Sequence, residues 1–357
     1  MKTAGDRIPW AKPCLWGDEA EYVKDAISSS WISGGPFIEQ LEAHLRHYLK
    51  IPYGVSVSNG TSAIHLAYLS LDIKGGDEVI LPAYGFLAAA NMTLHVGAKP
   101  VFCDVDSRSW VATAKEIVVI HTYGNVSPMD EIMDMAKGHG IAVIEDAAEA
   151  FGGKYKGRAA GTFGDIGTFS FHATKTITTG EGGFVATRRS ELHDVITLYR
   201  SHGMKRKIPY WHDVPGHNFR LTNLQAAIGV SQISHLEKIQ KERRRIYQTY
   251  RRECADIEGI RWQHFAKDVE PVIWTVGIQL DPSVYPQGRD AVIRELSQKG
   301  IETRPGFYTP NQHTYFSAPA LPLSEQLSRH VLCLPMYIEL TDPQIHTVAQ
   351  TLAGLKG

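Results

Sequence analysis

Apolar residues are spaced in two different ways along the first two thirds of the chain. Residues 18–30, 37–49 and 64–71 repeat apolar side chains every three or four positions, which predicts amphipathic helices. Seven short, mostly apolar runs predict strands: residues 55–57, 79–81, 100–105, 117–120, 141–144, 167–171 and 184–186. Strands that alternate with helices predict an α/β fold with a mainly parallel seven-stranded sheet between helices. The continuous apolar runs indicate strands buried on both faces.

The pattern changes after residue 235. Residues 234–254 are charged and helical in spacing, as in a connector between domains. Residues 274–280 then alternate between apolar and polar, which predicts an antiparallel strand with one face in solvent. We therefore predict a large domain over residues 1–235 and a smaller α+β domain over residues 236–357.

The composition is that of an ordinary globular protein of 357 residues, with 43% apolar and 21% charged residues. The formal net charge of −1 provides no field that would attract nucleic acid or an anionic membrane. Histidines and cysteines do not occur at zinc-ligand spacing, so no metal site is predicted. Four dispersed cysteines, no membrane-length apolar run and no apolar leader predict a cytoplasmic protein with free thiols. These cysteines are Cys14, Cys103, Cys254 and Cys333.

The strongest candidate for a nucleophile is Lys175. It directly follows the predicted strand 167–171 and precedes the glycine-rich turn Gly180–Gly183. Lysine is normally exposed, but in a pocket its neutral amine can attack a carbonyl group. His172, three residues earlier, is interpreted as structural, with a supporting role at the site as the alternative.

Three further segments place polar groups where ligands bind in open α/β sheets, beyond the strand ends. Ser58–Ser62 combines a glycine with the start of a helix, which suits a phosphate, although taken alone the segment favours a plain strand–helix turn with a Ser/Thr cap. Residues 141–149 deliver carboxylates, including Asp146, at the end of an apolar strand. A buried carboxylate needs a partner such as a protonated ring nitrogen, or it caps a turn. Residues 216–225 alone indicate only a polar loop.

Together, these segments resemble the DegT/DnrJ/EryC1/StrS sugar aminotransferase family of fold-type I enzymes, which depend on pyridoxal 5′-phosphate (PLP). The resemblance covers nearly the whole chain, and the order and spacing of its motifs are specific. The matching segments are Ile8-Pro9, Trp31-Ile32-Ser33-Gly34-Gly35-Pro36, Ser58-Asn59-Gly60-Thr61, Glu145-Asp146-Ala147-Ala148, Ser170 to Lys175, Gly300-Ile301-Glu302-Thr303-Arg304 and Leu334-Pro335-Met336.

The resemblance implies a role for each matching residue. Lys175 is implied to form the Schiff base with PLP and later to shuttle a proton. Asp146 is implied to keep the pyridine nitrogen protonated, which makes the ring an electron sink. Phe86 matches the aromatic residue that stacks on this ring.

The resemblance also implies how the cofactor phosphate is bound. Gly60, Thr61 and Ser170 match its ligands in the same chain. Asn218 matches a residue that reaches the phosphate of the neighbouring subunit, which implies a homodimer with shared active sites.

Three features depart from the family pattern. Glu149 stands at a cofactor-contacting position where many relatives have glutamine, and a carboxylate beside the phenolic oxygen of PLP would repel it unless one group is protonated. Gly85 replaces a common threonine, which predicts more room over the ring. The segment from Asp106 to His121 is shorter than the usual crossover, which predicts a sheet partly bare of helices there.

The implied reaction transfers an amino group from glutamate to a nucleotide-linked keto sugar. The Gly180–Gly183 stretch resembles that of enzymes acting at C4 of 4-keto-6-deoxyhexoses, such as perosamine synthases. A C3-keto sugar, an inositol-type ketone and a non-catalytic PLP-binding regulator remain alternatives. His172, Arg304 and His313 are candidate substrate contacts, chosen from polarity and position.

Overall fold

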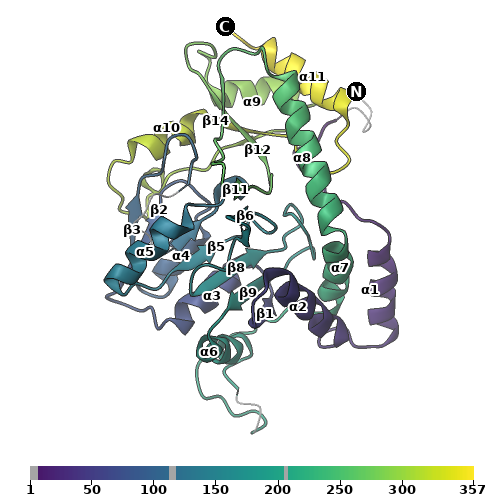
Figure 1. The fold of residues 1–357 in the computed structure, drawn as a ribbon, viewed down its shortest axis with the longest axis vertical. Helices are drawn as coiled ribbons and strands as arrows, with labels where there is room; N and C mark the ends of the chain where they lie inside the picture. The colour runs from purple at the N-terminus through teal and green to yellow at the C-terminus, as the bar shows by residue number, and fades with distance from the viewer. Residues whose placement is uncertain (1–6, 112–117, 205–207) are drawn as a thin grey trace.

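The fold is described here from a computed structural model, which covers residues 7–111, 118–204 and 208–357. A five-stranded mixed sheet lies at its centre (Figure 1). In spatial order its strands are β1 (Tyr53–Val57), β9 (Gly183–Thr187), β8 (Ile166–Ser170), β5 (Ile144–Asp146) and β4 (Val118–Ile120). The β4, β5 and β8 strands are parallel, whereas β9 runs antiparallel to both of its neighbours.

Two more strands extend the central layer beyond β4. The strands β2 (Glu78–Pro82) and β3 (Lys99–Cys103) form a parallel pair, and β2 contacts β4. All seven predicted strands are therefore present. The run at 141–144 becomes a strand only at its last residue, Ile144, and continues to Asp146.

Helices cover both faces of the central layer, and every residue of β8 and β9 is buried. One face packs against α2 (Pro36–Leu49), α5 (Met129–His139) and α7 (Asn223–Ser234). The other face packs against α3 (Gly60–Ser70), α4 (Ala88–His95) and α6 (Ser190–Arg200). Outside α7 lies α1 (Asp18–Ser28) (Figure 1). Among these helices, α7 begins with a capping box of Thr222 and Gln225.

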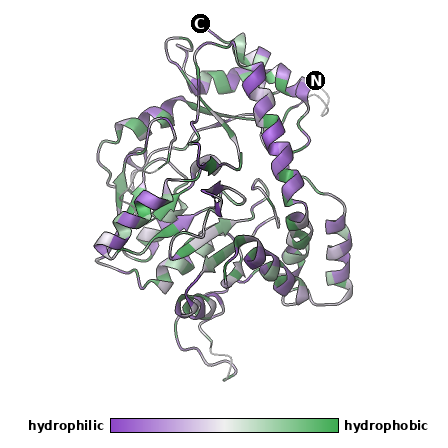
Figure 2. Ribbon diagram, viewed as in Figure 1, coloured by the Kyte–Doolittle hydropathy of each residue, from purple (hydrophilic) through white to green (hydrophobic). Residues whose placement is uncertain are grey.

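A long helix, α8 (Leu236–Glu253), runs from the central layer to a second, four-stranded sheet (Figure 1). It is more hydrophilic along its length than α7, which is green for much of its surface in Figure 2. The second sheet is antiparallel and has the order β10 (Ile260–Trp262), β12 (Val276–Leu280), β14 (Val331–Leu334) and β13 (Arg304–Pro305).

Three helices flank the second sheet: α9 (Arg289–Gln298), α10 (Pro322–His330) and α11 (Asp342–Ala353). A small three-stranded sheet of β6 (Lys154–Tyr155), β7 (Arg158–Ala159) and β11 (Val269–Glu270) joins segments that precede and follow α8. Short 3₁₀ turns occupy Thr122–Gly124 and Pro310–Gln312. The N-terminal Ile8 packs in the core around the second sheet and pairs with Ile301. A division at residue 235 stays a prediction.

The expectation of a solvent-facing strand at 274–280 is wrong. All five residues of β12 are buried, including the polar Gln279. The strand lies between β10 and β14, and Gly277 lets the ring of Trp110 pack closely over it. Alternation along the sequence therefore reflected a central strand with one polar residue rather than an exposed face.

The short segment after β3 packs against the C-terminal half of the chain. No helix is present in its described residues 104–111, and 112–117 lie outside the description. Trp110 is almost fully buried among side chains that include Tyr123 and Trp274. The carbonyl oxygen of Ser109 accepts hydrogen bonds from Asn125 and Gln263. Tertiary packing thus covers part of this region without a helix.

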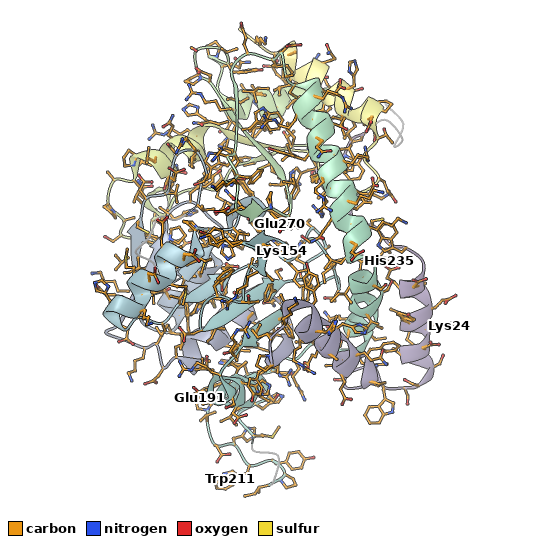
Figure 3. All side chains as sticks on the ribbon, in the orientation of Figure 1. Lys24, Lys154, Glu191, Trp211, His235 and Glu270 are labelled. Atoms are coloured by element: carbon orange, nitrogen blue, oxygen red, sulfur yellow. The ribbon has the colours of Figure 1, made fainter. Side chains whose placement is uncertain are left out.

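An arm between α6 and α7 projects away from the rest of the molecule, with Trp211 near its far end (Figure 3). Tyr210 is 91% exposed, and Ile208 and Trp211 are more than half exposed. Within the described parts of the chain, no helix has both the length and the apolar character needed to cross a bilayer.

Candidate active site

A cavity of about 1150 Å³ lies between the carboxyl ends of the central strands and the C-terminal half of the chain. Its walls include Thr61 at the start of α3, Asp146 at the end of β5 and Lys175 after β8. Trp274 and Arg304, from the segments around β12 and β13, close the other side. The chain thus places the predicted nucleophile, a carboxylate and a helix N-terminus in one cavity.

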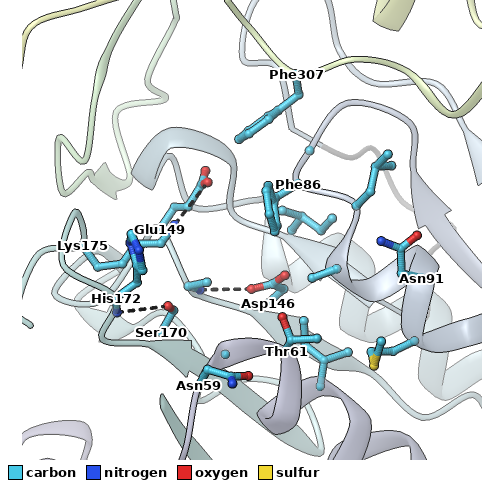
Figure 4. Close-up of a pocket in the computed structure, with 18 of the residues that line it drawn as sticks. Asn59, Thr61, Phe86, Asn91, Asp146, Glu149, Ser170, His172, Lys175 and Phe307 are labelled. Carbon is cyan, nitrogen blue, oxygen red and sulfur yellow. Dashed lines mark hydrogen bonds and ion pairs between the residues drawn. The ribbon is translucent and has the colours of Figure 1, made fainter. Parts of the chain in front are cut away.

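Lys175 is held largely out of water. Its side chain is 14% exposed, and its Nζ lies 3.5 Å from Glu149 Oε1 (Figure 4). The same Nζ lies 4.0 Å from the centre of the Trp274 ring. The amine thus lies between a carboxyl group and the face of an indole ring. The amine is therefore fixed at the cavity wall.

The two carboxylates at the end of β5 serve opposite sides of the strand, because neighbouring residues in a strand point to opposite faces. Glu145 points away from the cavity and accepts hydrogen bonds from the amides of Gly161, Phe163 and Gly164. Asp146 lines the cavity and accepts one hydrogen bond, from the Ala148 amide at 3.1 Å. Glu145 is thus structural, and Asp146 is the carboxylate available to a ligand.

A cationic partner would favour the ionised form of Asp146. Burial raises the pKa of its carboxyl group, although the Ala148 amide and the charge of Lys175 oppose the rise. A protonated ring nitrogen placed against it would stabilise the ionised form. The environment of Asp146 is therefore the one expected of a carboxylate that faces a pyridinium.

Glu149 is buried and only partly satisfied. Its Oε2 accepts a hydrogen bond from the Tyr123 amide at 2.8 Å. Its Oε1 is buried without a hydrogen-bond partner and has Lys175 at 3.5 Å as its nearest charge. Burial raises the pKa of Glu149, and the nearby Lys175 and the Tyr123 amide only partly oppose this. The environment of Glu149 thus favours the protonated form more than water does.

The predicted phosphate ligands lie together at the start of α3. The Asn59 side chain caps the helix by accepting from the Ser62 amide at 2.8 Å. The amides of Gly60 and Thr61 precede that capped position and line the cavity, as does Ser170. A Cβ on Gly60 would come within 2.9 Å of Ser170 Cβ, so only glycine allows this close approach. The positive helix end and these donors suit a phosphate.

Phe86 stands in the cavity beside Asp146, and its ring is 61% exposed (Figure 4). It makes an edge contact with Phe307, with the ring centres 6.2 Å apart. The extra room predicted at Gly85 is absent, because a Cβ there would lie 3.0 Å from Ile120 Cδ1. Ile120 fills the space that a larger residue at position 85 would take.

The three candidate substrate residues all line the cavity. His172 shares a hydrogen bond with Thr174 and lies 3.7 Å from Glu181. Arg304 pairs with Glu302, and His313 has a buried Nε2 without a partner. Arg304 thus has an acidic partner in its own chain.

Asn218 is the one predicted site residue that this chain does not bring to its own cavity, whose lining includes its neighbours His217 and Phe219. Its side chain accepts a hydrogen bond from Arg220 Nε at 2.9 Å. This placement agrees with a residue that serves another subunit, a role that stays a prediction.

Residues 13–353 match the model of the DegT/DnrJ/EryC1/StrS aminotransferase family. The chain belongs to this family. It is 37% identical to the GDP-perosamine synthase of Escherichia coli O157:H7, with 97% of each chain covered. It is 36% identical to a UDP-N-acetyl-3-dehydro-α-D-glucosamine 3-aminotransferase of Acidithiobacillus ferrooxidans, covering 87% of this chain and 86% of that protein.

The fold is also that of solved aminotransferases. The aminotransferase TlmJ of Streptoalloteichus hindustanus superposes with a TM-score of 0.92 at 30% identity, over 97% of this chain and 98% of that one. The predictions of the family, of the fold class, of an aminotransferase and of PLP as its cofactor are confirmed. The roles of individual residues stay predictions.

Sequence reasoning missed Trp274 and Tyr123, which contact Lys175 and Glu149. Trp274 stands in a predicted strand, where an aromatic residue is expected for packing alone. Tyr123 has a backbone φ of 59°, which is uncommon for a residue other than glycine. Only Gly124, next to Tyr123, gave a local signal of an unusual backbone at this place.

Glu149→Gln is predicted to change how the stability of the cofactor-free protein depends on pH. A raised pKa means that the folded protein holds this proton at pH values where the unfolded chain has lost it. Stability should therefore fall as pH rises from the ordinary value of 4.5 to the raised one, and the glutamine variant should lack this loss.

Urea unfolding at several pH values checks this prediction. The stability of the glutamine variant relative to the wild type should increase with pH through that window. Glu270→Gln, at an exposed carboxylate, is the control. A difference between Glu149→Gln and the wild type that stays constant from pH 4 to pH 8 would contradict the raised pKa.

Proposed function

We propose that this aminotransferase moves an amino group from glutamate to a nucleotide-linked keto sugar, at C4 of a 4-keto-6-deoxyhexose. One observation carries the proposal: the Lys175 amine, 14% exposed, shares a cavity with the buried Asp146 and the N-terminus of α3. The amine, the carboxylate and the anion site correspond to three parts of PLP that a protein must hold.

The residues present fit this cofactor. Gly60, Thr61 and Ser170 would bind its phosphate, and Phe86 would lie against the ring. Asp146 would face the ring nitrogen, whose positive charge compensates a carboxylate that burial otherwise disfavours. Glu149 would lie beside the phenolic oxygen, and burial raises the pKa of its carboxyl group.

When bound, PLP supplies an electron sink and carries the amino group between the two substrates. The chain supplies position and proton transfer. Lys175 Nζ would take a proton from the substrate carbon that bears nitrogen and return one on the cofactor side. The Trp274 ring, which lies against the amine, would keep water from that side of it. Glutamate would leave as 2-oxoglutarate.

The class of acceptor is inferred from the relatives and the size of the cavity. Perosamine synthase and the 3-aminotransferase both carry a nucleotide sugar in their names, one with GDP and the other with UDP. A cavity of about 1150 Å³ exceeds the common range of about 300–1,000 Å³ for small-molecule sites, which leaves room for a substrate beside the cofactor. C4 is favoured because the perosamine synthase match spans more of the chain; a C3-keto UDP sugar is the second candidate.

Incubation of the PLP-loaded protein with glutamate and single nucleotide-linked keto sugars tests this proposal. We expect 2-oxoglutarate release in equal amount to amino sugar, and the fastest release with a 4-keto-6-deoxyhexose. Mass spectrometry of the product identifies the acceptor. Faster turnover of a 3-keto sugar would transfer the assignment to C3, and no release with any nucleotide sugar would contradict the proposed acceptor class.

The proposal includes a homodimer with shared active sites and a cytoplasmic location. The exposed aromatic residues of the arm, Tyr210 and Trp211, support an interface with a second copy, since large exposed apolar groups commonly mark such surfaces. Asn218 lies at the base of this arm, outside its own cavity. The four cysteines, all within the described residues, form no disulfide with one another, which supports a reducing compartment.

The double substitution Tyr210→Ser and Trp211→Ser is predicted to convert the dimer into a monomer with weaker PLP binding. Removing two large apolar side chains from an interface commonly costs several kcal/mol, or at least about a hundredfold in dimer affinity. Sedimentation velocity and PLP titration measure both effects. Leu323→Ser, at an exposed apolar side chain of α10, is the control. A double variant that stays dimeric would contradict a role for the arm.

A further inference from the structure

Arg243 of α8 places a guanidinium inside the protein without an acidic partner. It is 5% exposed, and in the described part of the chain no carboxylate forms an ion pair with it. Its Nη1 donates to the carbonyl oxygens of Ile273 and Trp274, at 3.0 and 2.9 Å. Its Nη2 donates to the carbonyl oxygen of Lys175 at 3.4 Å. A buried charge is costly unless its donors are used, so this arrangement requires a reason.

All three carbonyl groups belong to segments that form the lysine site. Two flank the indole that faces Lys175 Nζ, and the third is that of Lys175 itself. The segments are far apart in the chain: one is the connection that follows β8 and the other leads into β12. Arg243 therefore connects α8 to both segments of the lysine site, the one that contains Lys175 and the one that contains Trp274.

The side chain of Trp274 forms a second tie between the same two segments. Its indole Nε1 donates to the carbonyl oxygen of Thr174 at 2.8 Å, one residue before Lys175. Its ring stacks near Tyr123 and meets Trp10 edge-on, with ring centres 6.1 and 5.9 Å apart. With 8% of its surface exposed, the indole has little freedom to turn away from the amine.

We propose that Arg243 is a positioning residue. It holds the Trp274 indole in place against the Lys175 amine when that amine is not bound to the cofactor. This inference rests on the proposed role of Lys175. During the reaction that amine must leave its bound state and still remain within reach of the substrate carbon. The indole face gives the released, charged amine a defined resting place close to Glu149.

Arginine suits this task better than lysine would. Its planar fork reaches three carbonyl groups in fixed directions, and it holds its charge when buried. Burial lowers the pKa of Arg243 to about 10, so the guanidinium still carries its charge at neutral pH. Lysine at the same position could donate to some of the carbonyl groups, but it lacks the planar group whose separate nitrogens bind both segments.

The test follows the chemical reactivity of Lys175 in the cofactor-free protein. A trace amount of acetic anhydride labels amines competitively at pH 7.5, and mass spectrometry compares Lys175 with exposed lysines such as Lys24 (Figure 3). Loss of the aromatic contact should raise the labelling rate of Lys175 about threefold to tenfold, since the indole face would no longer cover and hold the amine. Trp274→Leu and Arg243→Met should both show this rise.

Two conservative variants separate positioning from general stability. Trp274→Phe keeps an aromatic face but loses the hydrogen bond to Thr174, and it should show a smaller rise in Lys175 labelling than Trp274→Leu. Arg243→Lys keeps the charge, and it should show a smaller rise in Lys175 labelling than Arg243→Met. Arg245→Met is the matched control, because Arg245 lies on the same helix and binds Glu242 and Asp342 away from the site. It should destabilise the protein without changing the labelling of Lys175.

Each outcome decides the proposal. A folded Arg243→Met protein with wild-type labelling of Lys175 would overturn it, and so would an equal rise in Arg245→Met. If Arg243→Met does not fold, Arg243→Lys and Trp274→Phe decide, and wild-type labelling in both would overturn it. Because no cofactor is present, the result does not depend on whether Lys175 binds PLP, so the two ideas fail separately.

Discussion

Lys175→Ala is expected to lower kcat by at least about 10³-fold, because the variant loses both the amine that binds the cofactor and the group that moves the proton. The loss should appear with every amino donor and acceptor, since both halves of the reaction use the same Nζ. The visible absorbance of the PLP-bound lysine should also disappear. Steady-state kinetics and an absorbance spectrum of the purified protein measure the two effects.

Lys154→Ala is the control for this variant. Lys154 also lies in the first half of the chain, but it pairs with Glu270 at the surface and lies outside the cavity (Figure 3). It should keep normal turnover and normal absorbance. A Lys175→Ala protein that retained both would show that another lysine performs the chemistry.

Asp146→Asn is expected to lower kcat by about 10²–10³-fold, the usual effect of removing one preorganised charge from an active site. The neutral amide preserves the shape of the side chain and removes the negative charge that a protonated ring nitrogen needs. The Schiff base with Lys175 should still form, so the variant should bind PLP and absorb visible light. Single-turnover reaction with glutamate separates this slow proton transfer from weaker cofactor binding.

Asp165→Asn is the matched control, because Asp165 lies near the opposite end of β5. It accepts a hydrogen bond from the Val143 amide at 3.0 Å and pairs with Arg189, so its loss should lower stability and leave kcat unchanged. Equal single-turnover rates for the Asp146→Asn variant and the wild type would mean that Asp146 does not face the ring nitrogen.

Local sequence signals were sufficient to predict the half of the site that the first sheet supplies. Lys175, Asp146 and Gly60 each follow a buried strand within a few residues, and the carboxyl ends of such strands meet at one edge of a sheet. The sequence therefore predicted which residues would come together before their distances were known. The capping boxes at Thr222 and Thr341 are equally local, since each joins a threonine to the glutamine three positions later.

The other half of the site depends on packing between distant segments. Trp274 donates to the carbonyl oxygen of Thr174, 100 positions earlier in the chain, and no spacing rule connects them. The same holds for Arg243, whose partners are main-chain carbonyl groups and carry no side-chain signature. Such contacts follow from the docking of the second sheet against the first.

The pattern of apolar runs also did not predict the direction of β9. The connection from Ser170 to Gly183 contains no helix, and it is about as short as a parallel crossover can be, so β9 pairs antiparallel with β8. Close approach of Gly183 to Asn59 then brings this connection against the start of α3. Lys175 lies within that connection, so its position follows from the reversal of the chain.

The most direct measurement is to reduce the PLP-loaded protein with borohydride, digest it and find the modified residue by mass spectrometry. Borohydride converts the bond between PLP and a lysine into a stable amine, which labels the residue that held the cofactor. We predict the phosphopyridoxyl group on Lys175 alone. A label on any other lysine, or none after reduction of a protein that has bound PLP, would contradict the assignment of Lys175.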